Sequence, residues 1–324
     1  MIGRRTFSAA VLAELIALAP NAAARAQPAK APLIGVLVLG SPPPDLLLRV
    51  FREGLRKRGY VEGKNIALAV RSADGRAERL PDAAAELVRL RVNIIVAWQT
   101  PAVAAARRAT GDIPIVMAGA ADPVGNGFIA SLARPGGNVT GMTGSGTEIY
   151  RKGLELLRET VPTARSFGVL ANATDPFTPV YLRQLEEHAR TAALELHVAK
   201  VRPSDDLREA FARFAKARLQ GLIVQPSLLS PAIAVLALQH RLPSISGFRE
   251  FAEGGGLMSY ASNQAEMFDQ AARYVDLILK GRVPAELPVA QASRFELVIN
   301  LKTAKALRLE VPSLLLVRAD ELIE

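Results

Sequence analysis

The stretch Leu33-Ile34-Gly35-Val36-Leu37-Val38-Leu39 is an almost unbroken apolar run, and it is followed by Gly40, Ser41 and three prolines. A short apolar run that ends in turn-forming residues predicts a buried strand of a parallel sheet. The next segment, residues 45–58, carries apolar residues at helical spacing and ends before Gly59. Strand, loop and helix in this order predict the first unit of an α/β fold.

The same alternation continues along the chain. Further strands are predicted at residues 65–71, 92–97 and 113–117, with helices at 77–90 and 101–109. The pattern starts again near residue 147 and predicts a second unit of the same kind, with helices at 147–161, 181–194, 205–216 and 232–239 and strands at 166–170, 196–201, 221–224 and 244–246. We therefore predict an α/β fold of two Rossmann-like lobes, each built on a parallel sheet.

Three segments without helical periodicity connect these units. Residues 134–144 are rich in glycine, residues 254–256 are three glycines before an extended run, and residues 295–299 form another extended run. We expect three crossings between the lobes to act as a hinge. The alternative is that they are ordinary loops inside one large sheet. The predicted division places residues 33–143 plus 261–292 in lobe 1 and residues 144–256 plus 295–324 in lobe 2.

Residues 1–26 have the organisation of an export signal peptide. The pair Arg4-Arg5 precedes an Ala- and Leu-rich run at 8–19, and Ala24-Arg25-Ala26 resembles a cleavage site. The apolar run is too short to cross a bilayer of ~30 Å. The paired arginines resemble a twin-arginine signal, although Glu14 departs from that pattern. We expect export to the periplasm and no membrane span; the alternative for this segment is an amphipathic helix.

Composition narrows the function classes. The chain of 324 residues is long enough for two domains, and its 50% hydrophobic content is ordinary for a globular protein. The absence of cysteine excludes disulfides, thiolate metal sites and a lipid-modified cysteine. The formal net charge is +9, but basic residues are interleaved with acidic ones and aromatic residues are only 5%. No nucleic-acid partner is therefore predicted.

Motifs for catalysis are missing from the sequence. It contains no nucleophile elbow, no P-loop, no zinc-protease motif and no dinucleotide fingerprint after the first strand. The three histidines, His188, His197 and His240, do not have the spacing of metal ligands. We therefore predict a protein that is not an enzyme and that needs no cofactor.

Loops at the carboxyl ends of the predicted parallel strands are the expected binding region, because open α/β sheets bind ligands at that edge. Helix amino termini facing the same edge suit a carboxylate. Asp122 could pair with a ligand ammonium or form a turn, and the other polar residues could also be caps, turns or surface ion pairs. The predicted ligand-binding residues are Ser41, Gln99, Thr100, Asp122, Asn172, Asp175, Ser227, Phe248, Arg249 and Tyr260.

Several longer segments resemble one family, the ABC-transporter substrate-binding proteins of the TrpX-like group. The resemblance covers nearly the whole chain beyond the signal segment, and SLARPGGNVTG is long enough to be specific. The resembling segments are FREGL at 51–55, GYVEGKNI at 59–66, DPVG at 122–125, SLARPGGNVTG at 131–141, REF at 249–251, GGLMSY at 255–260 and FELVINLKTAK at 295–305.

The resemblance implies a type I periplasmic binding protein fold, with a small ligand in the cleft between two lobes and no cofactor. It also implies an amino acid ligand, aromatic ones included, and an ABC importer permease as partner. The family usually has Gly-Thr-Pro after the third strand, whereas here Gln99 precedes Thr100-Pro101, which implies a smaller or more polar pocket. The stretch after Ser227 is also shorter than the family pattern.

These observations predict a solute-binding component of an ABC importer that takes an amino acid or a related carboxylate. The ligand would favour a closed form by its differential affinity for that form. Two alternatives stay open: a periplasmic sensor that docks on a receptor kinase, and a hydrolase or isomerase of small metabolites.

Overall fold

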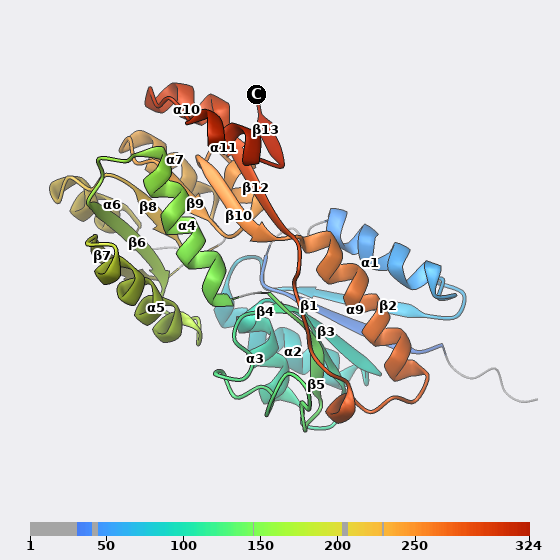
Figure 1. The fold of residues 1–324 in the computed structure, drawn as a ribbon. Coiled ribbons are helices and arrows are strands. Elements are labelled where there is room, and N and C mark those ends of the chain that lie inside the picture. The colour runs from blue at the N-terminus through green and yellow to red at the C-terminus, as the bar shows by residue number, and fades with distance from the viewer. Residues whose placement is uncertain (1–30, 41–44, 145, 203–206, 229) are drawn as a thin grey trace, which may run out of the picture. The chain divides into compact units, whose positions relative to one another are not determined.

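The chain forms two α/β sheets, each with helices on its faces (Figure 1). This arrangement confirms the predicted fold class. No helix in the described part of the chain is long and apolar enough to cross a membrane. The segment predicted to be an export signal, residues 1–26, lies outside the described residues. The computed structural model describes residues 31–40, 45–144, 146–202, 207–228 and 230–324.

The first sheet is built on the apolar run that opens the fold. This run forms β1 (Leu33–Val38), the second strand from one edge, which pairs in parallel with its neighbours on both sides. The pairs further along the sheet are also parallel. The order is β11 (Ala290–Gln291), β5 (Val139–Thr143), β4 (Ile115–Ala120), β3 (Ile94–Trp98), β1 and β2 (Ala67–Ser72).

Helices cover both faces of this sheet because its strands are apolar on both sides. On one face, α1 (Asp45–Lys57) and α9 (Gln264–Leu279) pack on Ile34 and Val36, with Phe51 and Phe268 in edge-to-face contact. On the other face, α2 (Leu80–Arg89) and α3 (Thr100–Ala109) pack on Leu37 and Ile95. The helix predicted at 77–90 divides into a short 3-10 turn, Ala77–Arg79, and α2, where Pro81 takes an early helical position.

The second sheet repeats this plan with one antiparallel pair among its described strands. That pair joins β10 and β12, and the other neighbours are parallel. The order is β13 (Glu321–Ile323), β12 (Phe295–Asn300), β10 (Met258–Ser262), β9 (Ser244–Ser246), β8 (Leu222–Val224), β6 (Ser166–Asn172) and β7 (Glu195–Val201).

Two further apolar clusters hold helices on this sheet. Helices α4 (Gly146–Thr160) and α5 (Thr178–Thr191) contribute Leu157 and Leu185 to the cluster around Val169. Helices α6 (Leu207–Lys216) and α7 (Pro231–Gln239) contribute Phe211 and Ile233 to the cluster around Leu170. The remaining elements are α8 (Arg249–Glu253), the 3-10 turn Pro284–Glu286, α10 (Leu301–Leu307) and α11 (Ser313–Arg318).

The chain passes between the sheets after β5, after β10 and after β11. The glycine-rich stretch 134–144, expected only as an extended connection, contains β5, which lies inside the first sheet. Its strand character becomes clear only through pairing, because β5 lies between β4 and β11.

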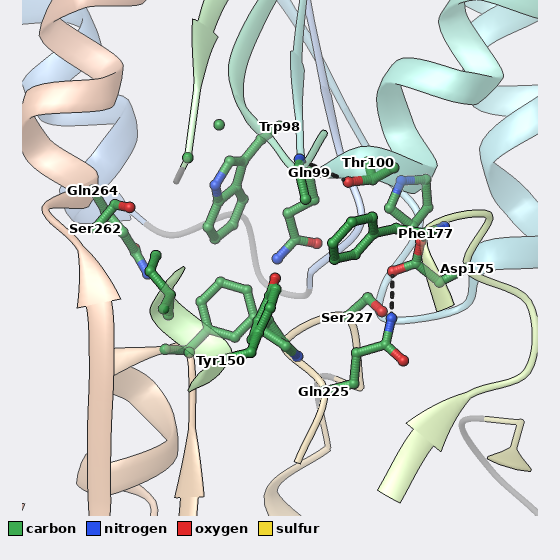
Figure 2. Close-up of a pocket in the computed structure, with 18 of the residues that line it drawn as sticks. Trp98, Gln99, Thr100, Tyr150, Asp175, Phe177, Gln225, Ser227, Ser262 and Gln264 are labelled. Carbon is green, nitrogen blue, oxygen red and sulfur yellow. Dashed lines mark hydrogen bonds between the residues drawn. The ribbon is translucent and has the colours of Figure 1, made fainter. Parts of the chain in front are cut away.

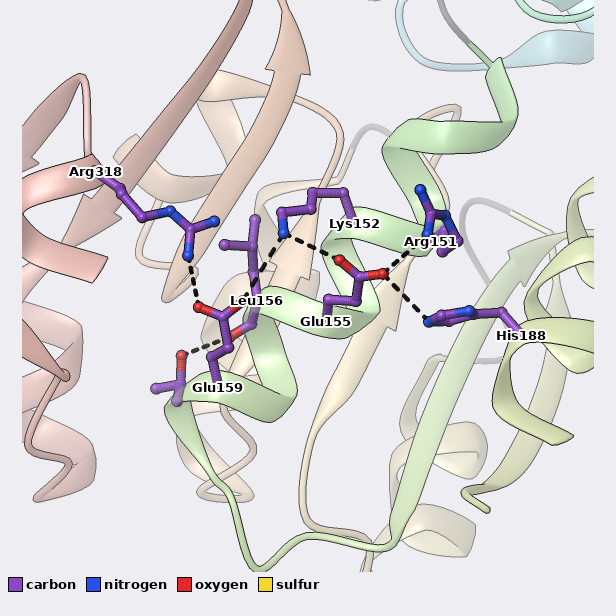
Figure 3. A network of polar contacts seen from close by, with 8 residues as sticks. Arg151, Lys152, Glu155, Leu156, Glu159, His188 and Arg318 are labelled. Carbon is purple, nitrogen blue, oxygen red and sulfur yellow. Dashed lines mark hydrogen bonds and ion pairs between the residues drawn. The ribbon is translucent and has the colours of Figure 1, made fainter. Parts of the chain in front are cut away.

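A charged network ties α4 to its neighbours (Figure 3). Glu155 accepts from Lys152 at 3.0 Å and lies 3.7 Å from the His188 ring of α5. Glu159 pairs with Arg318 of α11 at 2.8 Å. These pairs are partly exposed, so each adds little to stability by itself.

Candidate functional site

A cavity lies where strands of both sheets end. Its lining follows the carboxyl ends of β3, β4, β8, β9 and β10 and includes the first turns of α3 and α4. The cavity volume is about 80 Å³. At ~10–15 Å³ for each water-sized group, it has room for several such groups, as a small metabolite requires.

Asp175 lines this cavity and lies in the loop after β6. One of its carboxylate oxygens accepts from the backbone N–H of Phe177 at 2.9 Å, and the other accepts from the Gln225 amide at 3.1 Å. The Gln225 oxygen accepts in turn from the Asn172 N–H at 2.9 Å and from the Thr178 hydroxyl at 3.0 Å. The loops after β6 and β8 are therefore held together by one buried polar network.

Burial shifts the pKa values of the ionisable groups in the cavity lining. It raises the pKa of Asp175, while hydrogen bonds from Ser227, the Phe177 N–H and Gln225 act in the opposite direction. Burial and the nearby Asp175 carboxylate also raise the pKa of the Tyr150 phenol, which keeps its proton. The cavity lining therefore holds a carboxyl group that keeps its proton more readily than an exposed aspartate does.

Aromatic rings form the walls of the cavity. Trp98 packs edge-on against Phe248, with ring centroids 5.9 Å apart, and the Tyr150 and Phe177 centroids lie 5.8 Å apart. These rings come from both sheets, since Trp98 ends β3 and Phe248 follows β9. Aromatic walls with a few polar groups are typical of sites that bind small organic molecules.

Gln99 occupies an unusual position between β3 and α3. Its φ of 74° and ψ of 156° lie in a region that glycine almost alone adopts. Its side chain extends between Trp98, Phe177 and Tyr150 in Figure 2. The Gln99 side chain therefore occupies space that the aromatic rings would otherwise enclose.

A second hollow adjoins the first and shares Pro101 and Asp175 with it. Its lining includes Arg108 of α3 and Lys200 of β7, so cationic groups lie there. Among the described residues, no group of three or more acidic, histidine or cysteine side chains is placed to hold a metal ion.

The structure brings several of the predicted site residues to the cavity. Gln99, Thr100, Asp175, Ser227 and Phe248 line it. Asn172 is fully buried behind the lining, where its amide donates to the Ser227 carbonyl at 3.2 Å and its oxygen accepts from the Thr174 N–H at 2.9 Å. Whether these residues contact a ligand stays a prediction.

Three other predicted residues, Asp122, Arg249 and Tyr260, do not line the cavity. Asp122 has a φ of 38° and accepts from the Gly125 N–H at 2.9 Å, as a turn residue does. Arg249 pairs with Glu253 and with Glu321 of β13. Tyr260 stacks on Phe295, with centroids 5.9 Å apart. Ser41 lies outside the described residues.

Several lining residues were not predicted from the sequence. Tyr150, Phe177, Gln225 and Ser262 line the cavity. Gln225 stands in a strand-end loop beside the predicted Ser227, so its position was a usable signal. Tyr150 lies inside α4, and nothing in the local pattern separates it from an ordinary core tyrosine.

Two sheets with a cavity at their carboxyl edges define a protein of the type I periplasmic binding class. The chain belongs to the family of ABC transporter substrate binding proteins, whose sequence profile matches residues 34–323. This result confirms the family resemblance seen in the sequence.

Individual proteins are similar to this chain over most of its length. The tyrosine-binding protein of Clostridioides difficile (strain R20291) is 27% identical over 287 residues, which cover 86% of this chain and 81% of that protein. The crystal structure of a conserved domain protein from Vibrio cholerae O1 biovar El Tor has a TM-score of 0.83 at 27% identity, covering 90% of this chain and 100% of that one. An ABC domain from Streptococcus pneumoniae in complex with L-Trp has a TM-score of 0.82 at 24% identity, covering 90% and 99% of the two chains, and supports the fold.

Proposed function

We propose that this protein is the extracytoplasmic solute-binding component of an ABC importer, and that it holds an amino acid or a related carboxylate in the cavity between its sheets. The observation that carries the proposal is the cavity itself, which has aromatic walls from both sheets and the buried Asp175 carboxyl group in its lining. A ligand that contacts both sheets would favour the form in which they approach each other.

The cavity offers complementary positions for the two ends of an amino acid. The first turn of α3 begins at Thr100 and Pro101, and both residues line the cavity. Free N–H groups at a helix amino terminus suit a carboxylate. Among the described residues of the lining, Asp175 is the acidic one. It would therefore pair with a ligand ammonium, the role that the sequence suggests for Asp122.

Ligand screening tests this proposal. Trp98 is the single tryptophan of the chain and lines the cavity, so its fluorescence reports binding directly. We expect one or more amino acids to change that fluorescence and to raise the melting temperature, with a stabilisation of ~2.7 kcal/mol at a hundred times the dissociation constant. Asp175→Asn should weaken the binding. If the free amino acids and related carboxylates all leave both signals unchanged, the ligand class is wrong.

Turnover and transport need separate measurements. Mass spectrometry of the bound ligand after prolonged incubation should recover it unchanged, whereas a product would indicate a hydrolase or an isomerase. Deleting the gene should abolish uptake of the labelled ligand by the cells that carry it. Normal uptake combined with a lost transcriptional response would indicate a sensor that docks on a receptor kinase.

We further propose that residues 1–26 direct export to the periplasm by the twin-arginine route. A reporter fused to these residues should reach the periplasm, and replacing Arg4 and Arg5 by lysine should block this export. Export that persists after the replacement would indicate the general secretory route, and a reporter retained in the cytoplasm would contradict export.

A further inference from the structure

Gln99 combines a glycine-like backbone with a buried, unpaired side chain. It is the residue between β3 and α3, with a φ of 74°. The residue is only 6% exposed, and neither its amide nitrogen nor its amide oxygen has a hydrogen-bond partner among the described residues. Buried polar atoms are nearly always paired. Strained backbone with a specific side chain tends to occur at functional sites.

The direction of this side chain points to a ligand. Figure 2 shows the Gln99 amide extending between the rings of Trp98, Phe177 and Tyr150, within the cavity lining. These rings offer mainly apolar surface to the amide. A molecule in the cavity is therefore the natural partner for both amide atoms.

The remaining polar groups restrict the chemistry of that partner. Asp175 already accepts hydrogen bonds from the Phe177 N–H and from Gln225, and the Thr100 hydroxyl oxygen accepts from the Ala121 N–H at 3.0 Å. The described lining contains no lysine, arginine or histidine. An acidic ligand side chain would be buried there without a counter-charge, which is unfavourable. An apolar one would leave both Gln99 atoms unpaired.

We propose that Gln99 determines specificity by pairing with a carboxamide group, so that the ligand is an amino acid with a side-chain amide. An N–H of the ligand amide donates to the Gln99 oxygen, while the Gln99 NH₂ group donates to the ligand carbonyl. A large aromatic side chain is disfavoured because Gln99 occupies the space between the three rings. This inference rests on the proposed function, since it assumes an amino acid in this cavity.

Calorimetric titration with chemically matched ligands tests the pairing. The ligands are L-glutamine and L-asparagine, with L-glutamate, L-methionine and L-tryptophan as comparisons. We expect the wild-type protein to bind one of the two amides at least about tenfold more tightly than the comparisons, because a site built for hydrogen bonding rejects ligands that lack them. Gln99→Met keeps the side-chain length and should lose that tenfold preference. Gln99→Gly opens the space between the rings and should bind L-tryptophan more tightly than the wild type does.

Arg91→Gly is the matched control. Arg91 is exposed, follows α2 and has a φ of 53°, so this variant relieves a left-handed backbone away from the cavity. It should leave all the affinities unchanged. Circular dichroism and melting temperature establish that each variant is folded.

The outcomes separate this inference from the proposed function. If an amino acid binds but Gln99→Met does not change the ligand preference, the specificity role is wrong and the proposed function stands. The same holds if the wild type prefers L-tryptophan. If no amino acid binds the wild type at all, both ideas fail together.

Discussion

The side-chain amide of Gln225 donates to a carboxylate oxygen of Asp175 at 3.1 Å, and this bond joins the loops after β6 and β8 in the cavity lining. Gln225 is 1% exposed, so the bond is sheltered from water.

Replacing Gln225 by methionine keeps the side-chain volume but removes its bonds to Asp175, the Asn172 N–H and the Thr178 hydroxyl. Because it leaves buried polar groups unpaired, we expect a loss of about 2–4 kcal/mol of stability in urea unfolding. Gln239→Met on the exposed end of α7 is the control and should change stability by less than about 0.5 kcal/mol. Equal effects of the two variants would show that the network contributes nothing.

Asp175 should give stability a characteristic pH dependence. Its pKa is raised above the ordinary 3.8, mainly by burial, so the folded protein binds this proton more readily than the unfolded chain does. As pH rises from 3.8 through the raised pKa, the free energy of unfolding should fall in the wild type relative to Asp175→Asn. Urea midpoints of both proteins across this pH range measure the difference. If the wild type instead becomes more stable relative to Asp175→Asn as pH rises, the pKa of Asp175 is not raised.

The network in Figure 3 predicts that the pKa of His188 depends on Glu155. Burial lowers the pKa of His188, the Glu155 charge raises it, and Arg151 and Arg158 lower it. Glu155→Gln removes the one contribution that favours the imidazolium, so the pKa of His188 should fall further. Titration of the His188 ring signals by NMR measures this. Glu159→Gln is the control, because Glu159 pairs with Arg318 rather than with His188. A similar pKa shift of His188 in both variants would show that the shift does not come from the contact with Glu155.

Gly141 in β5 has no room for a side chain. Its φ is +123°, and an added Cβ would lie 2.5 Å from the backbone nitrogen of Met117 and closer still to the Met117 carbonyl oxygen. Gly141→Ala should therefore cost about 3 kcal/mol or more, or prevent folding. Gly137→Ala in the same segment is the control, since an added Cβ there meets no described atom within 4 Å. Comparable melting temperatures for the two variants would show that β5 can move away from β4.

The amino-acid sequence by itself determined the alternation of strands and helices, and with it the class of fold. Apolar runs such as 33–39 and helical spacing such as that of Phe51 and Leu55 are local properties, visible without knowing what each residue touches. The same logic placed Gln99, Thr100 and Ser227 at strand ends, where parallel sheets bind ligands.

Only the tertiary structure decided which of these strand-end residues face the cavity. The Asn172 amide donates to the Ser227 carbonyl, and Arg249 forms an ion pair with Glu321 in a strand far along the chain. Tyr150, inside a helix of the second sheet, reaches the cavity that Trp98 also lines. Such choices depend on long-range pairing and packing, because a side chain takes the partner that the folded chain brings to it, and local spacing carries no information about that partner.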